Sequence, residues 1–165
     1  MDAAGNPVAD AQVALSTETI GVLVSHGKLE PMRGNVAESR IVQTDSQGTF
    51  MLGQHAPESF DLIVAHDRGF ASIGSGAFHD SNEIHLQPWG RIEGRVARDP
   101  GTGGRKISMS GLPNPTWFLN KQEYRYETEY DADGHFVFEK VPAGWFEAGY
   151  LIRVGDSFWS VTCRT

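Results

Sequence analysis

The first half of the chain alternates apolar and polar residues over short stretches that turn-forming residues separate. Residues 12–15 alternate as a half-buried strand does, and residues 60–66 form the clearest strand pattern of this half. Residues 41–44 and 49–52 flank a polar turn, which predicts a hairpin. Residues 16 to about 39 form a long variable stretch that glycines and prolines break up, and no strand is assigned there. Further strands of this half are expected at residues 70–73 and 83–87.

The second half shows the same kind of pattern. From residue 91 to residue 96, charged residues alternate with Ile92, Gly94 and Val96, which predicts a strand with one apolar face. Residues 125–130 alternate charged residues with Tyr and Thr and predict a strand with one solvated face, and residues 135–139 are expected to pair back with it. Further strands are expected at residues 106–110, 145–153 and 158–163. Helical spacing is not sustained over a dozen residues anywhere, so we expect an all-β fold.

One phrase occurs twice. Asp45-Ser46-Gln47-Gly48-Thr49-Phe50 returns 86 residues later as Asp131-Ala132-Asp133-Gly134-His135-Phe136. Asp and Gly tolerate the backbone geometry of tight turns, so the phrase predicts a turn between strands. A phrase that recurs at domain spacing indicates two related domains in tandem.

The repeat divides the chain into a first domain at residues 1–87 and a second at residues 88–165, each of a size that can fold on one core. Short strands at close spacing predict a Greek-key β-sandwich for each, of the prealbumin-like or immunoglobulin-like type. Residues 87–90 form the join, which is too short for a flexible linker. The two domains are therefore expected to keep a restricted relative orientation, with Trp89 at or near their contact.

A complete strand pattern, Gly90-Arg91-Ile92-Glu93-Gly94-Arg95-Val96, precedes the second copy, and the first copy has no equivalent. We therefore expect the opening strand of the first domain to be truncated and one sheet edge there to be exposed or differently filled. Unprotected edges recruit other chains, which makes an edge-strand dimer a further expectation.

Charge and cysteine content narrow the function only a little. The chain carries 14 Lys and Arg against 21 Asp and Glu, a net charge of −7, which disfavours nucleic acid as a partner. No apolar segment approaches the roughly 20 residues of a spanning helix, so membrane insertion of this segment is not expected. Cys163 is the single cysteine and cannot form an intrachain disulfide.

Two pieces of sequence point to a family. One is a Gly-x-Val stretch leading into a Gly/Pro turn and a strand, as in Gly94-Arg95-Val96 through Ile107 and Met109, with a truncated counterpart from Gly5 to Leu15. The other is the repeated Asp-x-x-Gly-x-Phe, followed in the second half by Val141-Pro142-Ala143-Gly144-Trp145. Together they resemble the carboxypeptidase regulatory-like domain, a small β-sandwich related to the transthyretin (prealbumin) fold, in two copies.

The resemblance implies an accessory module of secreted or membrane-anchored proteins, commonly in bacterial envelopes. Such modules serve as spacers, docking surfaces or sugar binders. An extracytoplasmic location, at the cell surface, in the periplasm or secreted, is implied by the resemblance alone. So are the expected partners, which are neighbouring domains of a parent chain or other envelope proteins.

Candidate metal and catalytic residues have simpler interpretations. Asp131 and Asp133 look like the start of a calcium loop, but Lys140 stands where an EF-hand needs a carboxylate, and a turn needs these acids anyway. The histidines His66, His79 and His85 lack metal-ligand spacing. Ser25-His26 belongs to no recognisable triad order. We therefore expect no catalytic residue, no metal site and no cofactor.

Aromatic residues are the one feature that favours ligand binding. Thirteen of the 17 aromatics lie at or beyond Trp89. Trp117, Tyr124 and Tyr126 are the candidates for an exposed face that stacks on a sugar or on a partner. The alternative is that the aromatics of this half build the core and shield its edge. The first hypothesis is thus a non-enzymatic structural or interaction module, and the second is a carbohydrate-binding module that uses these three side chains.

Overall fold

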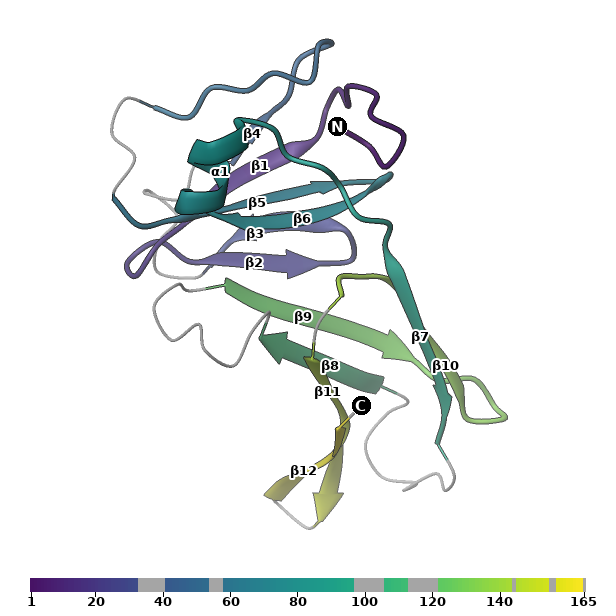
Figure 1. Cartoon of the computed structure of the whole chain (residues 1–165). Helices are drawn as coiled ribbons and strands as arrows, with labels where there is room; N and C mark the ends of the chain where they lie inside the picture. Colours follow the sequence, from purple (N-terminus) through teal and green to yellow (C-terminus); the bar gives the residue numbers. More distant parts are fainter. Residues whose placement is uncertain are drawn as a thin grey trace.

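The computed structural model in Figure 1 describes residues 1–32, 41–53, 58–96, 106–112, 122–143, 145–154 and 157–164, with the backbone alone for residue 112 and residues 145–164. Within them the chain forms strands and one short helix, which confirms the all-β prediction. The strands are β1 (Gln12–Ser16), β2 (Val22–Ser25), β3 (Lys28–Pro31), β4 (Ile41–Gln43), β5 (Asp61–His66), β6 (Gly69–Gly74), β7 (Gly90–Arg95), β8 (Lys106–Leu112), β9 (Gln122–Glu129), β10 (His135–Val141), β11 (Trp145–Val154) and β12 (Ser157–Arg164), and the helix is α1 (Ser75–Ser81).

The described strands form three sheets. The first sheet has the order β4-β1-β5-β6, the small sheet pairs β10 with β7, and the large sheet has the order β12-β11-β8-β9-β2-β3. Strand β5 lies inside the first sheet and is buried along its length from Asp61 to Ala65. Its two faces pack into different cores, because successive side chains of a strand point to opposite sides.

The two cores are separated by the first sheet. One face of β5 contributes Ile63 to a core that also holds side chains of β2, β3, β8, β9 and β10. The opposite face contributes Leu62 and Val64 to a second core, which is completed by Val8, by Ile84 and Leu86 after α1, and by partly buried Phe50. The first core thus takes residues from both halves of the chain.

The β2–β3 hairpin joins the halves. Residues 22–24 of β2 pair in parallel with residues 122–124 of β9, so the large sheet continues from the second half into the first. At its tip, His26 and Gly27 both have positive φ, 50° and 79°, which is the geometry of a two-residue type I′ turn. The sequence analysis assigned no strand to the variable stretch at residues 16–39 and therefore missed this hairpin at residues 22–31. Alternation around His-Gly was the signal that could have found it.

The pairing across the repeated turns also differs from the expectation. Residues 135–141 pair antiparallel with β7 and not with β9, and β9 pairs with β8. Among the described residues, 49–52 are in no strand at all. In the second half, the turn carries the chain from the large sheet to the small one, which local alternation cannot distinguish from a hairpin. In the first half, the turn leads from β4 into residues that join no strand.

Helix α1 was not predicted. It has seven residues, no side-chain hydrogen bond at its N-cap and no buried residue, so it carries almost no helical signal. After it, residues 83–87 return to the first sheet, where Phe70 and Gln87 exchange two backbone hydrogen bonds of 2.9 and 2.8 Å. The division of the chain at residue 87 stays a prediction, but neither the large sheet nor the first core stops there.

Candidate interaction surfaces

The two copies of the repeated phrase adopt the same turn. In each, the Asp carboxylate accepts backbone N–H groups two and four residues on, at 2.8 and 2.9 Å for Asp45 and at 2.9 and 2.9 Å for Asp131. The backbone closes with Gly48 N–H to Asp45 O at 2.9 Å and Gly134 N–H to Asp131 O at 3.0 Å. Both glycines have φ near the left-handed region, 74° and 82°. This turn is an Asx-type structure that glycine completes.

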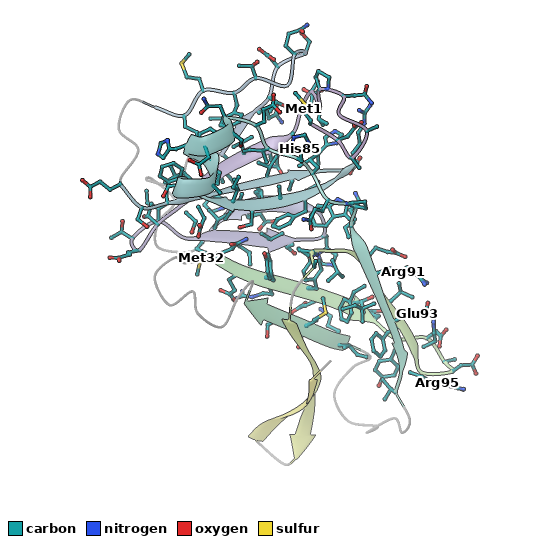
Figure 2. All side chains as sticks on the ribbon, in the orientation of Figure 1. Met1, Met32, His85, Arg91, Glu93 and Arg95 are labelled. Atoms are coloured by element: carbon teal, nitrogen blue, oxygen red, sulfur yellow. The ribbon has the colours of Figure 1, made fainter. Side chains whose placement is uncertain are left out.

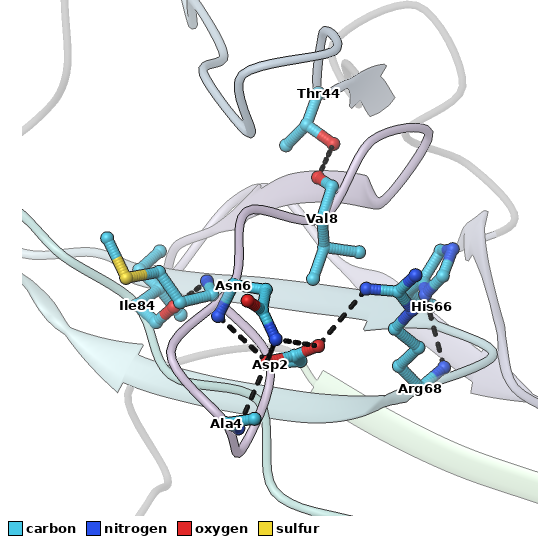
Figure 3. A network of polar contacts seen from close by, with 9 residues as sticks. Asp2, Ala4, Asn6, Val8, Thr44, His66, Arg68 and Ile84 are labelled. Atoms are coloured by element: carbon cyan, nitrogen blue, oxygen red, sulfur yellow. Dashed lines mark hydrogen bonds and ion pairs between the residues drawn. The ribbon is translucent and has the colours of Figure 1, made fainter.

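A third copy of the turn lies at the start of the chain, and sequence reasoning missed it. The Asp2 carboxylate accepts the N–H groups of Ala4 and Asn6 at 3.0 and 2.9 Å, and Gly5 has φ 81°. Figure 3 shows these bonds together with the ion pair from Arg68 to Asp2, 3.1 Å long. The signal was present as Asp-x-x-Gly, but no phenylalanine stands two residues after this glycine.

The carboxylate of Asp131 is used inside its own turn. Its two backbone hydrogen bonds, above all the one from His135, lower the pKa of Asp131 below the ordinary value. In the described part of the chain, no three His, Cys, Asp or Glu side chains lie together as a metal site would need. Asp131 therefore has a structural task, as the turn interpretation requires.

Acid is expected to loosen this turn. A carboxyl whose folded-state pKa lies below its unfolded value of 3.8 stabilises the fold above that value, and the stabilisation is lost as pH falls through the folded-state pKa. Asp131→Ala is expected to lower the urea midpoint at neutral pH, and its difference from wild type is expected to narrow as the pH falls below 3.8 and through the lowered folded-state pKa of Asp131. Asp131→Asn, which keeps an oxygen acceptor, is the matched control and is expected to stay closer to wild type at neutral pH. A difference for Asp131→Ala that is unchanged in acid would contradict the role of the charge.

The candidate histidines have separate surroundings. The ring of His66 accepts a hydrogen bond from the backbone N–H of Arg68 at 3.1 Å. His79, on α1, packs edge-on against Phe60 with ring centroids 6.0 Å apart, and His85 lies 3.5 Å from Glu83. The structure does not bring the three together.

Ser25 and His26 do contact each other, at the tip of the β2–β3 hairpin. Ser25 Oγ lies 2.8 Å from His26 Nδ1, and His26 Nε2 lies 3.0 Å from the backbone oxygen of Glu127. A carbonyl that accepts from Nε2 leaves Nδ1 to accept from the serine hydroxyl. The ring of His26 also lies against Tyr126, with centroids 5.4 Å apart. These contacts tie the hairpin tip to β9.

The predicted aromatic face was wrong for two of its three members. Tyr124 is 1 % exposed and Tyr126 is 0 % exposed, so both belong to the core. On β9 they alternate with Arg125 and Glu127, which are exposed, so the solvated face of this strand is its charged one. Burial raises the pKa of both hydroxyls far above the ordinary tyrosine value. Trp117 lies outside the described residues.

Contacts at the join hold the two halves together, and Trp89 lies among them as predicted. Its indole N–H donates to the backbone oxygen of His66 at 2.7 Å, and its ring lies 5.3 Å from that of Phe70. On the same side, the Lys140 ammonium contacts the Asp67 carboxylate at 2.5 Å, and this ion pair lowers the pKa of Asp67. Trp89 of the join thus contacts His66 and Phe70 of the first half, and Lys140 of the second half contacts Asp67 of the first.

A hollow of about 470 Å³ lies between the two halves, lined by Phe70 and Pro88 on one side and by Tyr124 and Pro142 on the other. Two of its lining residues, Ser72 and Tyr124, are joined through Gln122: Ser72 Oγ donates to Gln122 Oε1 at 3.3 Å, and Gln122 Nε2 donates to the hydroxyl of Tyr124 at 3.0 Å. Gln122 is 3 % exposed. The polar groups are thus engaged with one another, and they fix β9 against β6.

Strand β7 presents charged side chains to solvent. Figure 2 labels Arg91, Glu93 and Arg95 along this strand. Arg91 pairs with Glu93 and, at 2.9 Å, with Glu139 of β10, and Arg95 donates to the backbone oxygen of Asp133 at 2.7 Å. Exposed ion pairs of this kind contribute little to the free energy of folding, but the Arg91–Glu139 pair does connect the side chains of β7 and β10.

A groove of about 320 Å³ lies beside the first-half copy of the turn. Its walls come from the turn and Phe50, from Phe78 of α1 and from the first sheet. Val8 of the N-terminal segment and, after α1, Ile84 and Leu86 complete them. The segment after the turn runs along the upper margin of the molecule in Figure 1. Its Met51 is 87 % exposed, which makes it the most exposed large apolar side chain among the described residues.

Comparison with protein-family models, with curated proteins and with solved structures finds no match. Within the described residues, no helix is long and apolar enough to cross a membrane.

Proposed function

We propose that this chain is a non-catalytic structural and interaction module, a rigid spacer with docking surfaces within a larger secreted or envelope-anchored protein. In this proposal the two halves are carboxypeptidase regulatory-like units with Greek-key sandwich topology. The repeated Asp-x-x-Gly-x-Phe turn, with the same hydrogen bonds in both halves, supports the idea of two related units.

The single observation that carries the spacer role is the parallel pairing of β2 with β9. It places a hairpin of the first half in the sheet of the second half. Side chains of β2, such as Val24, and of β9, such as Tyr126, then share one core. Two units that share a sheet and a core cannot reorient without breaking backbone hydrogen bonds and exposing apolar surface. Such a pair keeps the segments attached to its two ends at a fixed distance and orientation, which is what a spacer requires.

The location outside the cytoplasm and the partners, which are neighbouring domains or other envelope proteins, belong to the same proposal and rest on the family resemblance. Nucleic acid is disfavoured by the net charge of −7. A glycan is not proposed as ligand, because Tyr124 and Tyr126 are buried. No cofactor is part of the proposed role.

The spacer role predicts one fixed distance between the halves. Ser46→Cys and Ala132→Cys, in a Cys163→Ser background, place spin labels at equivalent exposed positions of the two repeated turns. Pulsed electron resonance is expected to give a single narrow distance distribution. A broad distribution with several maxima would show that the halves move independently and would contradict the proposal.

Trp89→Ala in the same labelled background is the matched variant. It removes the indole hydrogen bond to His66 and the contact with Phe70 but leaves the β2–β9 pairing in place. We expect a modestly wider distribution with the same maximum. A broad distribution with several maxima in Trp89→Ala would mean that the indole contacts, and not the shared sheet, fix the relative orientation of the two halves.

A further inference from the structure

Strand β6 lies at one end of the first sheet, and its outer edge is only partly paired. On this edge, Phe70 exchanges two backbone hydrogen bonds with Gln87, at 2.9 and 2.8 Å. Backbone groups of a strand point to the same side at every second residue, so the N–H and C=O of Ser72 point outward as those of Phe70 do. Neither backbone group of Ser72 has a hydrogen bond to a described residue. The pairing that Gln87 begins therefore stops before Ser72.

The hollow between the halves lies along this edge. Ser72 and Ile73 of β6 line it, and Gln87 and Pro88 line it where the pairing stops. Its volume of about 470 Å³ falls within the range of about 300–1,000 Å³ that is usual for ligand sites. An extended peptide in this hollow would pair with Ser72 as Gln87 pairs with Phe70, which is recognition by strand addition.

The two walls of the hollow lie on opposite faces of the first sheet. On one face, Ile73 packs with Ile84 in the second core, and the segment after α1 continues this wall. On the other face, Ser72 Oγ donates to Gln122, and Tyr124 and Pro142 of the second half form the wall. Residues that lie opposite each other in a sheet share a face, so a peptide residue opposite Ser72 meets the second wall. Its two neighbours in the peptide meet the first wall.

The walls also differ in charge. The wall after α1 includes Glu83, whose side chain is 54 % exposed, and His85, which Figure 2 labels. Glu83 is the only Asp, Glu, Lys or Arg among the described residues that line the hollow. The opposite wall is largely apolar, with Tyr124, Pro142 and Ala143. A strand that fits both walls therefore has an apolar residue opposite Ser72 and a cationic residue on either side of it.

Other strand edges of this protein are protected, and β6 is not. Strand β3 carries exposed Lys28 and Glu30 and ends at Pro31, three features that discourage pairing with other chains. Strand β4, at the other end of the first sheet, has three residues. Residues 71–74 of β6 are Ala-Ser-Ile-Gly, with no charge and no proline. The edge of β6 thus lacks the features that would keep a strand away.

We infer that the outer edge of β6 at Ser72 accepts a short extended peptide of a partner protein, with an apolar residue flanked by Lys or Arg. The bound segment is short because Gln87 occupies the edge at Phe70 and β6 ends at Gly74. Main-chain hydrogen bonds supply the affinity in this mode of recognition, and the two walls supply the specificity. The inference rests on the proposed role as an interaction module. The spin-label measurement reads only the relation between the halves, so each can fail without the other.

The probe is the peptide acetyl-Gly-Lys-Val-Lys-Gly-amide, whose single valine specifies the register. Titration into the whole chain, followed by backbone NMR, is expected to shift the amides of residues 71–74, 83–85 and 143. The same peptide with an N-methyl group on the valine lacks the N–H that donates to Ser72 O, and is expected to bind about tenfold more weakly. Equal binding of the two peptides, no shifts at millimolar peptide, or shifts confined to other strands would overturn the inference.

Two variants of the chain test the charge of the wall. Glu83→Gln and the matched control Glu30→Gln each remove one exposed carboxylate, so both are expected to leave folding intact. Glu83→Gln is expected to weaken binding of the peptide about two- to fivefold, as the loss of an exposed ion pair does, and Glu30→Gln is expected to leave it unchanged. An equal effect of both variants would refute the role of Glu83. Concentration-dependent shifts of the same amides without peptide would overturn the inference in favour of pairing with a second copy of this chain.

Discussion

Replacing Tyr124 by alanine is expected to lower the free energy of unfolding by about 3–5 kcal/mol, the range for a large buried aromatic. Tyr124 is 1 % exposed and packs edge-on against Phe70 of the first half, with ring centroids 6.0 Å apart. It belongs to the core that takes residues from both halves. The loss is therefore expected in both halves together and not in the second alone.

Urea unfolding combined with hydrogen exchange tests this expectation. Amides of β5 in the first half and of β8 in the second are expected to lose protection by similar amounts in Tyr124→Ala. Tyr124→Phe is the matched control, since it keeps the ring and removes only the hydroxyl that accepts from Gln122, at a cost of about 1 kcal/mol. Protection that falls in β8 but stays unchanged in β5 would show that the shared core does not couple the halves.

The three turn glycines provide the second large effect as a graded series. All three have similar positive φ, 81° for Gly5, 74° for Gly48 and 82° for Gly134, so alanine meets a similar backbone strain of about 1–2 kcal/mol at each. Their surroundings differ. A Cβ at Gly134 would lie 2.6 Å from Val96 O, one at Gly48 would lie 3.2 Å from Val8 N, and one at Gly5 would meet nothing within 4 Å.

Gly134→Ala is thus expected to cost the most, about 2–4 kcal/mol, then Gly48→Ala and last Gly5→Ala. Since a backbone oxygen cannot swing aside as a side-chain end can, the clash at Gly134 has to be relieved by moving β7 or the turn. Urea midpoints of the three variants, measured under one condition, give the order. An equal loss of stability in all three variants would mean that only the backbone strain at positive φ matters, and that β7 can move away from a Cβ at residue 134 without loss of stability.

Local chemistry predicted much of this fold. The Asp-x-x-Gly turns form where the sequence places them because the carboxylate and the glycine act within five residues. The alternation on β9 correctly assigned the charged side chains Arg125 and Glu127 to solvent. It could not tell whether Tyr124 and Tyr126 would face solvent as a binding surface or face a core, because an aromatic side chain suits both.

Pairing between distant strands was beyond the sequence pattern. Residues 22–24 alternate as any strand does, and nothing in them indicates parallel pairing with residues 122–124. The same holds for β10. Its alternation of side chains is compatible with pairing to β9 and equally with the observed pairing to β7.

The amino-acid pattern was enough to specify the all-β character, the position of the repeated turns and the solvated face of β9, since each depends on residues within a few positions of one another. Only the folded chain showed which strands share a sheet, that the two halves share a core, and that two tyrosines are buried while Met51 is exposed. This difference arises because a strand has two faces and two edges. Its own residues specify the faces, but the edge partner is chosen by the packing of the whole chain.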